Sequence, residues 1–101
     1  MEVIAECKLI CRKRNGERIP VTLRLGKPFL SSDVDWACPV AAEGLYQHLT
    51  NIHGVDSFQA LVLAQGLLRN LMQGEIESGS TFHWPESGEQ MSIEDLFGKA
   101  L

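Results

Sequence analysis

Three cysteines and three histidines are the side chains of this sequence that could bind a transition metal: Cys7, Cys11, Cys38, His48, His53 and His83. Cys7 and Cys11 share one face of a predicted strand, but four residues of strand span ~13 Å. Two ligands of one zinc ion must each lie ~2.0–2.3 Å from it, so these thiols cannot share an ion. We therefore predict no metal site and expect the cysteines to be small buried apolar residues.

Cys38 is the candidate for a cysteine nucleophile, with His48 or His83 as its base. A reactive thiolate needs a nearby cation or a helix N-terminus. The sequence places neither beside Cys38, and Pro39 indicates a strand residue that packs beside Trp36. We therefore predict no catalytic residue and no cofactor.

Asp33 and Asp35 lie close to Ser31 and Ser32, in a segment that could form a cation-binding turn. The spacing lacks the glycine and the distant glutamate of a calcium loop. We interpret the segment as a solvated loop.

A basic cluster surrounds Asn15-Gly16 and consists of Arg12, Lys13, Arg14 and Arg18. It could contact an acidic protein or enter a nucleic-acid groove, or it could keep an exposed hairpin tip soluble. Residues 1–27 carry seven basic and three acidic side chains, whereas residues 28–73 carry one and four, and residues 74–101 one and six. The total of −4 disfavours a general nucleic-acid binder, which needs an excess of cations.

The composition is that of an ordinary globular protein, with 101 residues of which 45% are hydrophobic and 22% charged. This size predicts a single domain over residues 1–101. No apolar run is long enough to span a bilayer, and acidic residues interrupt the N-terminus where a secretory signal would be apolar. Together with an odd number of cysteines, these features lead us to expect a cytoplasmic protein with free thiols.

Alternating apolar residues on both sides of Asn15-Gly16 predict a β-hairpin. A two-residue loop would set every apolar residue against a polar one, which a half-buried sheet does not allow. A three-residue loop, with Gly16 in the left-handed conformation, places Lys13 opposite Glu17. That register pairs Cys11 with Ile19, Leu9 with Val21, Cys7 with Leu23, Ala5 with Leu25, Lys8 with Thr22 and Glu6 with Arg24.

Two further strands are expected after the hairpin. Gly26-Lys27-Pro28 ends the second strand, and residues 36–41 alternate as a third strand that lies at an edge or bulges at Pro39. Residues 45–53 form a possible fourth strand.

The clearest predicted element is a helix over residues 57–73, which has Asp56 as N-cap, Gln59 three residues later and Gly74 after its end. Its apolar residues cover an arc of more than ~180°, with Val62 and Leu63 at the borders of a narrow polar strip. We expect this helix to be covered on two sides. The second cover would be the chain end, through Phe82, Trp84, Leu96 and Phe97, or another molecule.

Ser92 and Asp95 predict the cap of a brief C-terminal helix that presents Ile93, Leu96 and Phe97. The expected fold class is therefore α+β. It consists of a three- to four-stranded antiparallel sheet with one long helix packed on one face and a short C-terminal helix.

Four stretches in order, LGKP at residues 25–28, WACP at 36–39, EGL at 43–45 and GVDSFQAL at 54–61, resemble a family of small bacterial proteins with a domain of unknown function. The similarity runs from about residue 19 to residue 73, with an echo at residues 92–97. The resemblance implies a bacterial, cytoplasmic protein, and it brings no activity or catalytic residue.

Nothing in the sequence shows a biochemical activity, and three hypotheses stay open. The first is a non-catalytic protein-binding module, self-associating or immunity-like, in which Arg12, Lys13, Arg14, Arg18, Val62 and Leu63 are the candidate partner contacts. The second is a small enzyme or ligand-binding protein that gathers His48, His83 or Cys38 with Tyr46 or Trp84 in one pocket. The third is a nucleic-acid accessory protein that uses the basic hairpin tip.

Overall fold

The computed structural model describes residues 1–47 and 49–99, which form eight strands and two helices. In chain order they are β1 (Val3–Arg12), β2 (Arg18–Gly26), β3 (Phe29–Leu30), β4 (Trp36–Cys38), β5 (Val40–Glu43), β6 (Ile52–Gly54), α1 (Ser57–Glu77), β7 (Thr81–His83), β8 (Gln90–Met91) and α2 (Ile93–Phe97).

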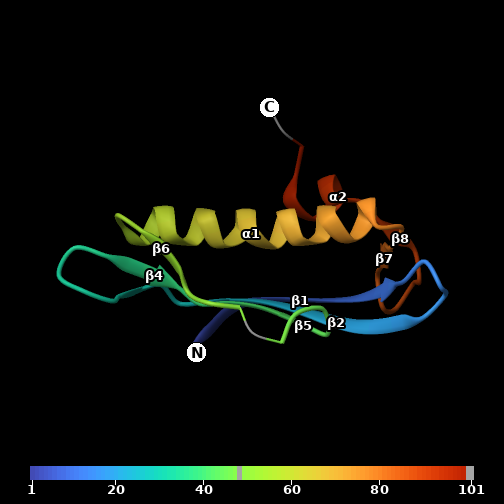
Figure 1. Cartoon of the computed structure of the whole chain (residues 1–101), viewed down its shortest axis with the longest axis horizontal. Helices are drawn as coiled ribbons and strands as arrows, with labels where there is room; N and C mark the ends of the chain where they lie inside the picture. Colours follow the sequence, from blue (N-terminus) through green and yellow to red (C-terminus); the bar gives the residue numbers. More distant parts are fainter. Residues whose placement is uncertain (48, 100–101) are drawn as a thin grey trace.

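Two antiparallel sheets form one side of the molecule, and α1 lies along the other (Figure 1). The main sheet has the order β5-β2-β1-β7-β8, and the small sheet has the order β3-β4-β6. The small sheet packs against the N-terminal part of α1, and the β1–β2 turn lies at the opposite end of the molecule (Figure 1). The predicted α+β class is confirmed.

The β1–β2 hairpin has the predicted register, with Cys11 opposite Ile19, Leu9 opposite Val21, Cys7 opposite Leu23 and Ala5 opposite Leu25. The Lys13 N–H donates to the Glu17 carbonyl at 2.7 Å, which closes the three-residue loop. Gly16 has φ +91°, the left-handed conformation that this loop requires. Side-chain alternation therefore fixed the register, because only one pairing buries one face.

The predicted third strand over residues 36–41 is wrong as a single element. Pro39 divides it into β4, which belongs to the small sheet, and β5, which is the edge strand of the main sheet. Proline has no N–H for a ladder, whereas its carbonyl accepts from the Gly26 N–H at 2.8 Å. The chain therefore leaves one sheet and joins the other at this residue.

The possible fourth strand over residues 45–53 is also wrong in extent. Among the described residues of this stretch, only those of Ile52–Gly54 form a strand, and this strand, β6, pairs with β4 in the small sheet. After β5 the chain turns back, and a single β-bridge joins Tyr46 to Ala42 of β5. Gly44 lies in this turn with φ +99°, a left-handed conformation that glycine adopts without a steric penalty.

Helix α1 begins as predicted and extends four residues beyond the predicted end. The Asp56 carboxylate accepts from the Gln59 N–H at 2.7 Å, and the Gln59 side chain accepts from the Val55 N–H at 2.8 Å. Gly74 does not end the helix, because Glu75 and Ile76 in the next turn have tertiary partners that offset the helix cost of one glycine.

The core lies between the sheets and one stripe of α1 made of Ala60, Ala64, Leu68 and Met72. The chain end does not supply the expected second cover along the whole of α1, so cover by another molecule stays a prediction for the remainder. Val62 and Leu63 remain 46% and 47% exposed. The two alanines let the helix lie close to the strands, so that a single narrow stripe suffices for packing.

The chain end contributes to the core in a way that the sequence did not indicate. Phe82 is fully buried in β7, which pairs with β1 inside the main sheet rather than lying over α1. Leu96 and Phe97 of α2 do pack beside α1, and the Ser92–Asp95 capping box forms as predicted. Neither described helix is both long and apolar enough to cross a lipid bilayer.

Candidate functional site

A pair of like charges marks the end of the main sheet next to the β1–β2 turn. Arg12 and Arg18 stand directly opposite each other in the β1–β2 ladder, and both are exposed. Lys13 and Glu17 form the adjacent hydrogen-bonded pair, so Arg12 and Arg18 form a non-hydrogen-bonded pair, in which opposing side chains are closest. Like charges in this position destabilise a sheet.

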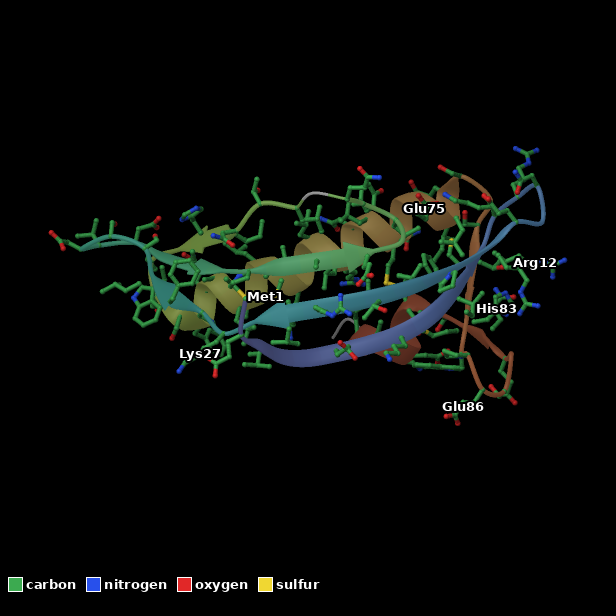
Figure 2. The ribbon with its side chains drawn as sticks, turned by 90° about the horizontal axis from the view of Figure 1, so that it is seen from below. Met1, Arg12, Lys27, Glu75, His83 and Glu86 are labelled. Carbon is green, nitrogen blue, oxygen red and sulfur yellow. The ribbon has the colours of Figure 1, made fainter. Side chains whose placement is uncertain are left out.

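Strand β7 adds an imidazole to the same face of the sheet. Ile10 pairs with His83 and Arg12 pairs with Thr81, so both β7 side chains lie on the face of the sheet that carries Arg12. Figure 2 shows His83 close to Arg12. The Gly88 carbonyl lies 3.0 Å from His83 Nδ1 and can only accept, so Nδ1 carries the proton. His83 Nε2 lies 2.8 Å from the Thr81 hydroxyl and forms a hydrogen bond with it.

These residues line a recess that we call the basic cleft. It is formed by Arg12, Gly16, Arg18, His83 and Gly88 and has a volume of about 250 Å³. A second hollow of about 350 Å³ shares Arg12 and His83 and reaches Lys13 and Arg14. Across residues 1–47 and 49–99, no carboxylate oxygen lies within 4.0 Å of a nitrogen of Arg12, Arg14 or Arg18. These guanidinium groups are therefore open to an external anion.

Lys13, which the sequence grouped with the basic cluster, has a structural partner instead. Its Nζ lies 2.9 Å from Glu75 Oε2, and this oxygen also accepts from the buried Ser80 hydroxyl at 3.1 Å. The hydrogen bond to Glu75 raises the pKa of Lys13. Lys13 thus fastens the hairpin to the last turn of α1, and the basic cluster open to solvent is reduced to Arg12, Arg14 and Arg18.

The cysteine and histidine candidates are not assembled into a reactive group. Cys38 is buried in β4, its thiol donates to the Gly26 carbonyl at 3.4 Å, and burial raises its pKa. Burial also raises the pKa of Cys7 and Cys11, which disfavours a thiolate. His83 lies in the basic cleft, Tyr46 lines a different hollow, and His48 lies outside the described residues. Among the residues that the structure describes, no three metal-ligating side chains converge.

Asp35 has a local role in the loop that joins β3 to β4. Its carboxylate lies 2.6 Å from His53 Nδ1, and its carbonyl accepts from the Ser31 N–H at 2.9 Å. The interpretation of this segment as a solvated loop agrees with these contacts, because each of them holds the loop to β6 or closes its turn.

Val62 and Leu63, the apolar candidates for a partner contact, lie on the part of α1 that faces solvent. Phe58, one turn before Val62, is 75% exposed. Phe58 and Val62 are neighbours four residues apart on one face of the helix, and Leu63 follows Val62 directly, so a partner contact at these residues stays a prediction.

The fold and the basic cleft define a small α+β protein with an anion-accessible end. The chain belongs to the family described as a domain of unknown function (DUF6968), which it matches over residues 7–93. None of the curated proteins and none of the solved structures with which the chain was compared matches it.

Proposed function

We propose that this chain is a non-catalytic protein-binding module whose basic cleft binds an acidic segment of a partner protein. The observation that carries the proposal is the direct opposition of Arg12 and Arg18, which no described carboxylate neutralises. A guanidinium binds a carboxylate with two parallel hydrogen bonds, so two adjacent arginines favour a segment with successive acidic side chains.

The surroundings of the basic cleft favour a polypeptide over a nucleic acid. Gly88 in its wall belongs to the β7–β8 turn, which also carries Glu86 and Glu89, and Glu86 lies at the same end of the molecule as His83 (Figure 2). A continuous phosphate backbone that crossed the basic cleft would approach these acidic residues. A short acidic segment can end inside the basic cleft and avoid them.

The peptide test is a titration of isotope-labelled protein with hexaglutamate, followed by the amide resonances. We expect the resonances of residues that line the basic cleft to shift at low salt. The double variant Arg12→Glu/Arg18→Glu should bind about tenfold more weakly or worse, because both attractive charges become repulsive. The matched control is Lys27→Glu/Lys99→Glu, which changes the net charge equally on exposed residues away from the basic cleft.

Three results would contradict the proposal. Hexaglutamate could leave these resonances unmoved, or the control variant could lose as much affinity as the double variant. A DNA duplex could also shift the same resonances at lower concentration than the peptide, which would favour a nucleic-acid function.

The like-charge pair should also be visible as a stability effect. Arg18→Thr removes the repulsion from Arg12, and we expect it to raise the free energy of unfolding by about 0.2–1 kcal/mol at low salt. In 1 M salt, where charges are screened within about 3 Å, the gain should shrink. Urea unfolding at both salt concentrations measures it.

Arg24→Thr is the control for that experiment. It makes the same chemical change in the same strand, but Arg24 lies between Glu6 and Glu43 and bonds to both. This variant should show no gain at low salt. Equal gains for Arg18→Thr and Arg24→Thr would mean that the β-propensity of threonine, and not the charge pair, sets the result.

A further inference from the structure

Strand β1 has a free edge over most of its length. On one side it pairs with β2 along the whole strand, whereas on the other side β7 pairs only with Ile10, Cys11 and Arg12. Within residues 1–47 and 49–99, no strand pairs with Val3–Leu9 on that second side. Figure 2 shows this part of β1 at the margin of the sheet. An edge of this kind is a template for another strand.

The regular part of this edge is five residues long. The β1–β2 register is irregular between Val3 and Ala5, and it runs without a break from Ala5 onward. Because Lys13 bonds to Glu17 across the hairpin, the backbone groups of odd-numbered β1 residues point to β2. The N–H and C=O groups of Glu6 and Lys8 therefore point to the free side, where β7 does not reach them.

We propose that this free edge pairs antiparallel with the same edge of a second copy of the chain, about a two-fold axis at Cys7. The two main sheets then join into one continuous sheet, and both α1 helices lie on the same face of it. This inference is separate from the proposed function, because Arg12 and the basic cleft lie beyond the part of β1 that would pair.

The charges of β1 select this register. With the axis at Cys7, Glu6 of each copy stands opposite Lys8 of the other, and Ala5 stands opposite Leu9. Opposite charges across a ladder stabilise it, and like charges destabilise it. A shift of the axis by one residue sets either Glu6 or Lys8 against itself. The Glu6 and Lys8 side chains are both exposed on the face away from α1. Glu6 Oε2 already accepts from Arg24 Nε at 2.9 Å, so Lys8 of the second copy would join this ion pair.

The core-facing side of the same edge offers apolar surface to the second copy. A groove of about 260 Å³ runs beside β1, and its lining includes Ala5, Cys7, Leu68, Leu96 and Phe97. A two-fold axis perpendicular to the sheet keeps both grooves on one face and brings them next to each other. Pairing would thus cover apolar side chains of α2 that the lone chain leaves half-exposed.

Cys7 allows a direct test of the position of the two-fold axis. Its backbone groups point to β2, so two copies of Cys7 would form a non-hydrogen-bonded pair with Cα atoms about 4.5 Å apart. This separation lies within the range of about 4.4–6.8 Å that a disulfide spans. Cys11 and Cys38 are fully buried and cannot reach a second molecule.

The first experiment measures the molar mass by light scattering and sedimentation over a range of concentrations. We expect a dimer for the natural chain, and for Lys27→Glu, which places the same charge change outside the edge. Lys8→Glu and Glu6→Lys should each raise the dimer dissociation constant about tenfold or more. Mixing these two variants should restore a dimer, because each Glu–Lys pair then re-forms between unlike chains.

Circular dichroism melts of the single variants establish that they fold, and the mixing step makes the result independent of any small loss of stability. A monomer at every concentration of the natural chain would overturn the proposal. A dimer that Lys8→Glu leaves intact would overturn it as well, because the contact would then lie elsewhere, for example at Val62 and Leu63.

The second experiment oxidises the protein with copper phenanthroline and oxygen. Two Cys7 thiols would give up two protons and two electrons to the oxidant and form one S–S bond. We expect a covalent dimer from the natural chain and none from Cys7→Ser, which keeps Cys11 and Cys38. Failure of the natural chain to cross-link while it is dimeric in solution would exclude the axis at Cys7.

Discussion

Replacement of Phe82 by alanine should lower the free energy of unfolding by about 3–5 kcal/mol. Phe82 is fully buried and is the largest of the fully buried side chains. It stands between Cys11 of β1 and Met91 of β8, so its loss leaves a cavity where three strands meet. Since the free energy of unfolding of a domain is only about 5–15 kcal/mol, this one substitution should remove a large part of it.

Phe58→Ala is the matched control, because it makes the same chemical change on a side chain that is 75% exposed. It should change the stability by no more than about 0.5 kcal/mol. Urea unfolding of both variants gives the comparison. Similar losses would mean that Phe58 is covered in solution, and a small loss for Phe82→Ala would mean that β7 does not belong to the core.

Gly54→Ala should destabilise the fold by about 1–3 kcal/mol or more. Gly54 is buried in β6, where it lies directly against the first turns of α1. A Cβ atom at this position would lie 2.5 Å from the Ala60 nitrogen and 3.0 Å from its Cα. Both are backbone atoms of the helix, so the contact can be relieved only by moving α1 away from the small sheet.

Gly66→Ala should have the opposite sign. Gly66 lies within α1, and an added Cβ would meet nothing within 4 Å. Alanine favours the helix by up to about 1 kcal/mol over glycine, so thermal and urea unfolding should show a gain. If both substitutions destabilised the protein, the space around Gly66 would be too small for a Cβ atom. If both stabilised it, β6 would not lie as close to α1 at Gly54 as described.

The features that the sequence predicted well are those decided by neighbouring residues. The hairpin register follows from strict alternation around Asn15-Gly16, and the start of α1 follows from the hydrogen-bonding capacity of Asp56 and Gln59. Ser92 and Asp95 cap α2 for the same reason. In each case the partner groups lie within a few residues, and the chemistry of the side chains limits the possible local structures.

The features that escaped prediction depend on contacts between distant segments. Pro39 was correctly associated with an edge or an irregularity, but nothing local indicates that β4 and β5 enter different sheets. The short Thr81–His83 segment alternates as a strand does, yet its place beside β1 is set by packing of Phe82 in the core. Likewise the end of α1 depends on Glu75, whose partner is Lys13.

The candidate site was predicted in part for the same reasons. Arg12 and Arg18 are close in sequence through the hairpin, so the register brings them together. His83 and Thr81 could not be added to the basic cleft without the pairing of β7 with β1. A possible signal was the Thr-Phe-His alternation, in which the two polar residues share one face while phenylalanine points to the core.

The hydrogen bond between the Gly26 N–H and the Pro39 carbonyl joins the two ends of an excursion of the chain that contains β3 and β4. Its tip, residues 31–35, is exposed or half-exposed and lies beyond the last pair of the β3–β4 ladder. Because the entropy of closing a loop grows only slowly with its length, residues could be gained or lost there at little thermodynamic expense. We therefore expect the length of this tip to vary among members of the family, while the two sheets keep their positions relative to each other.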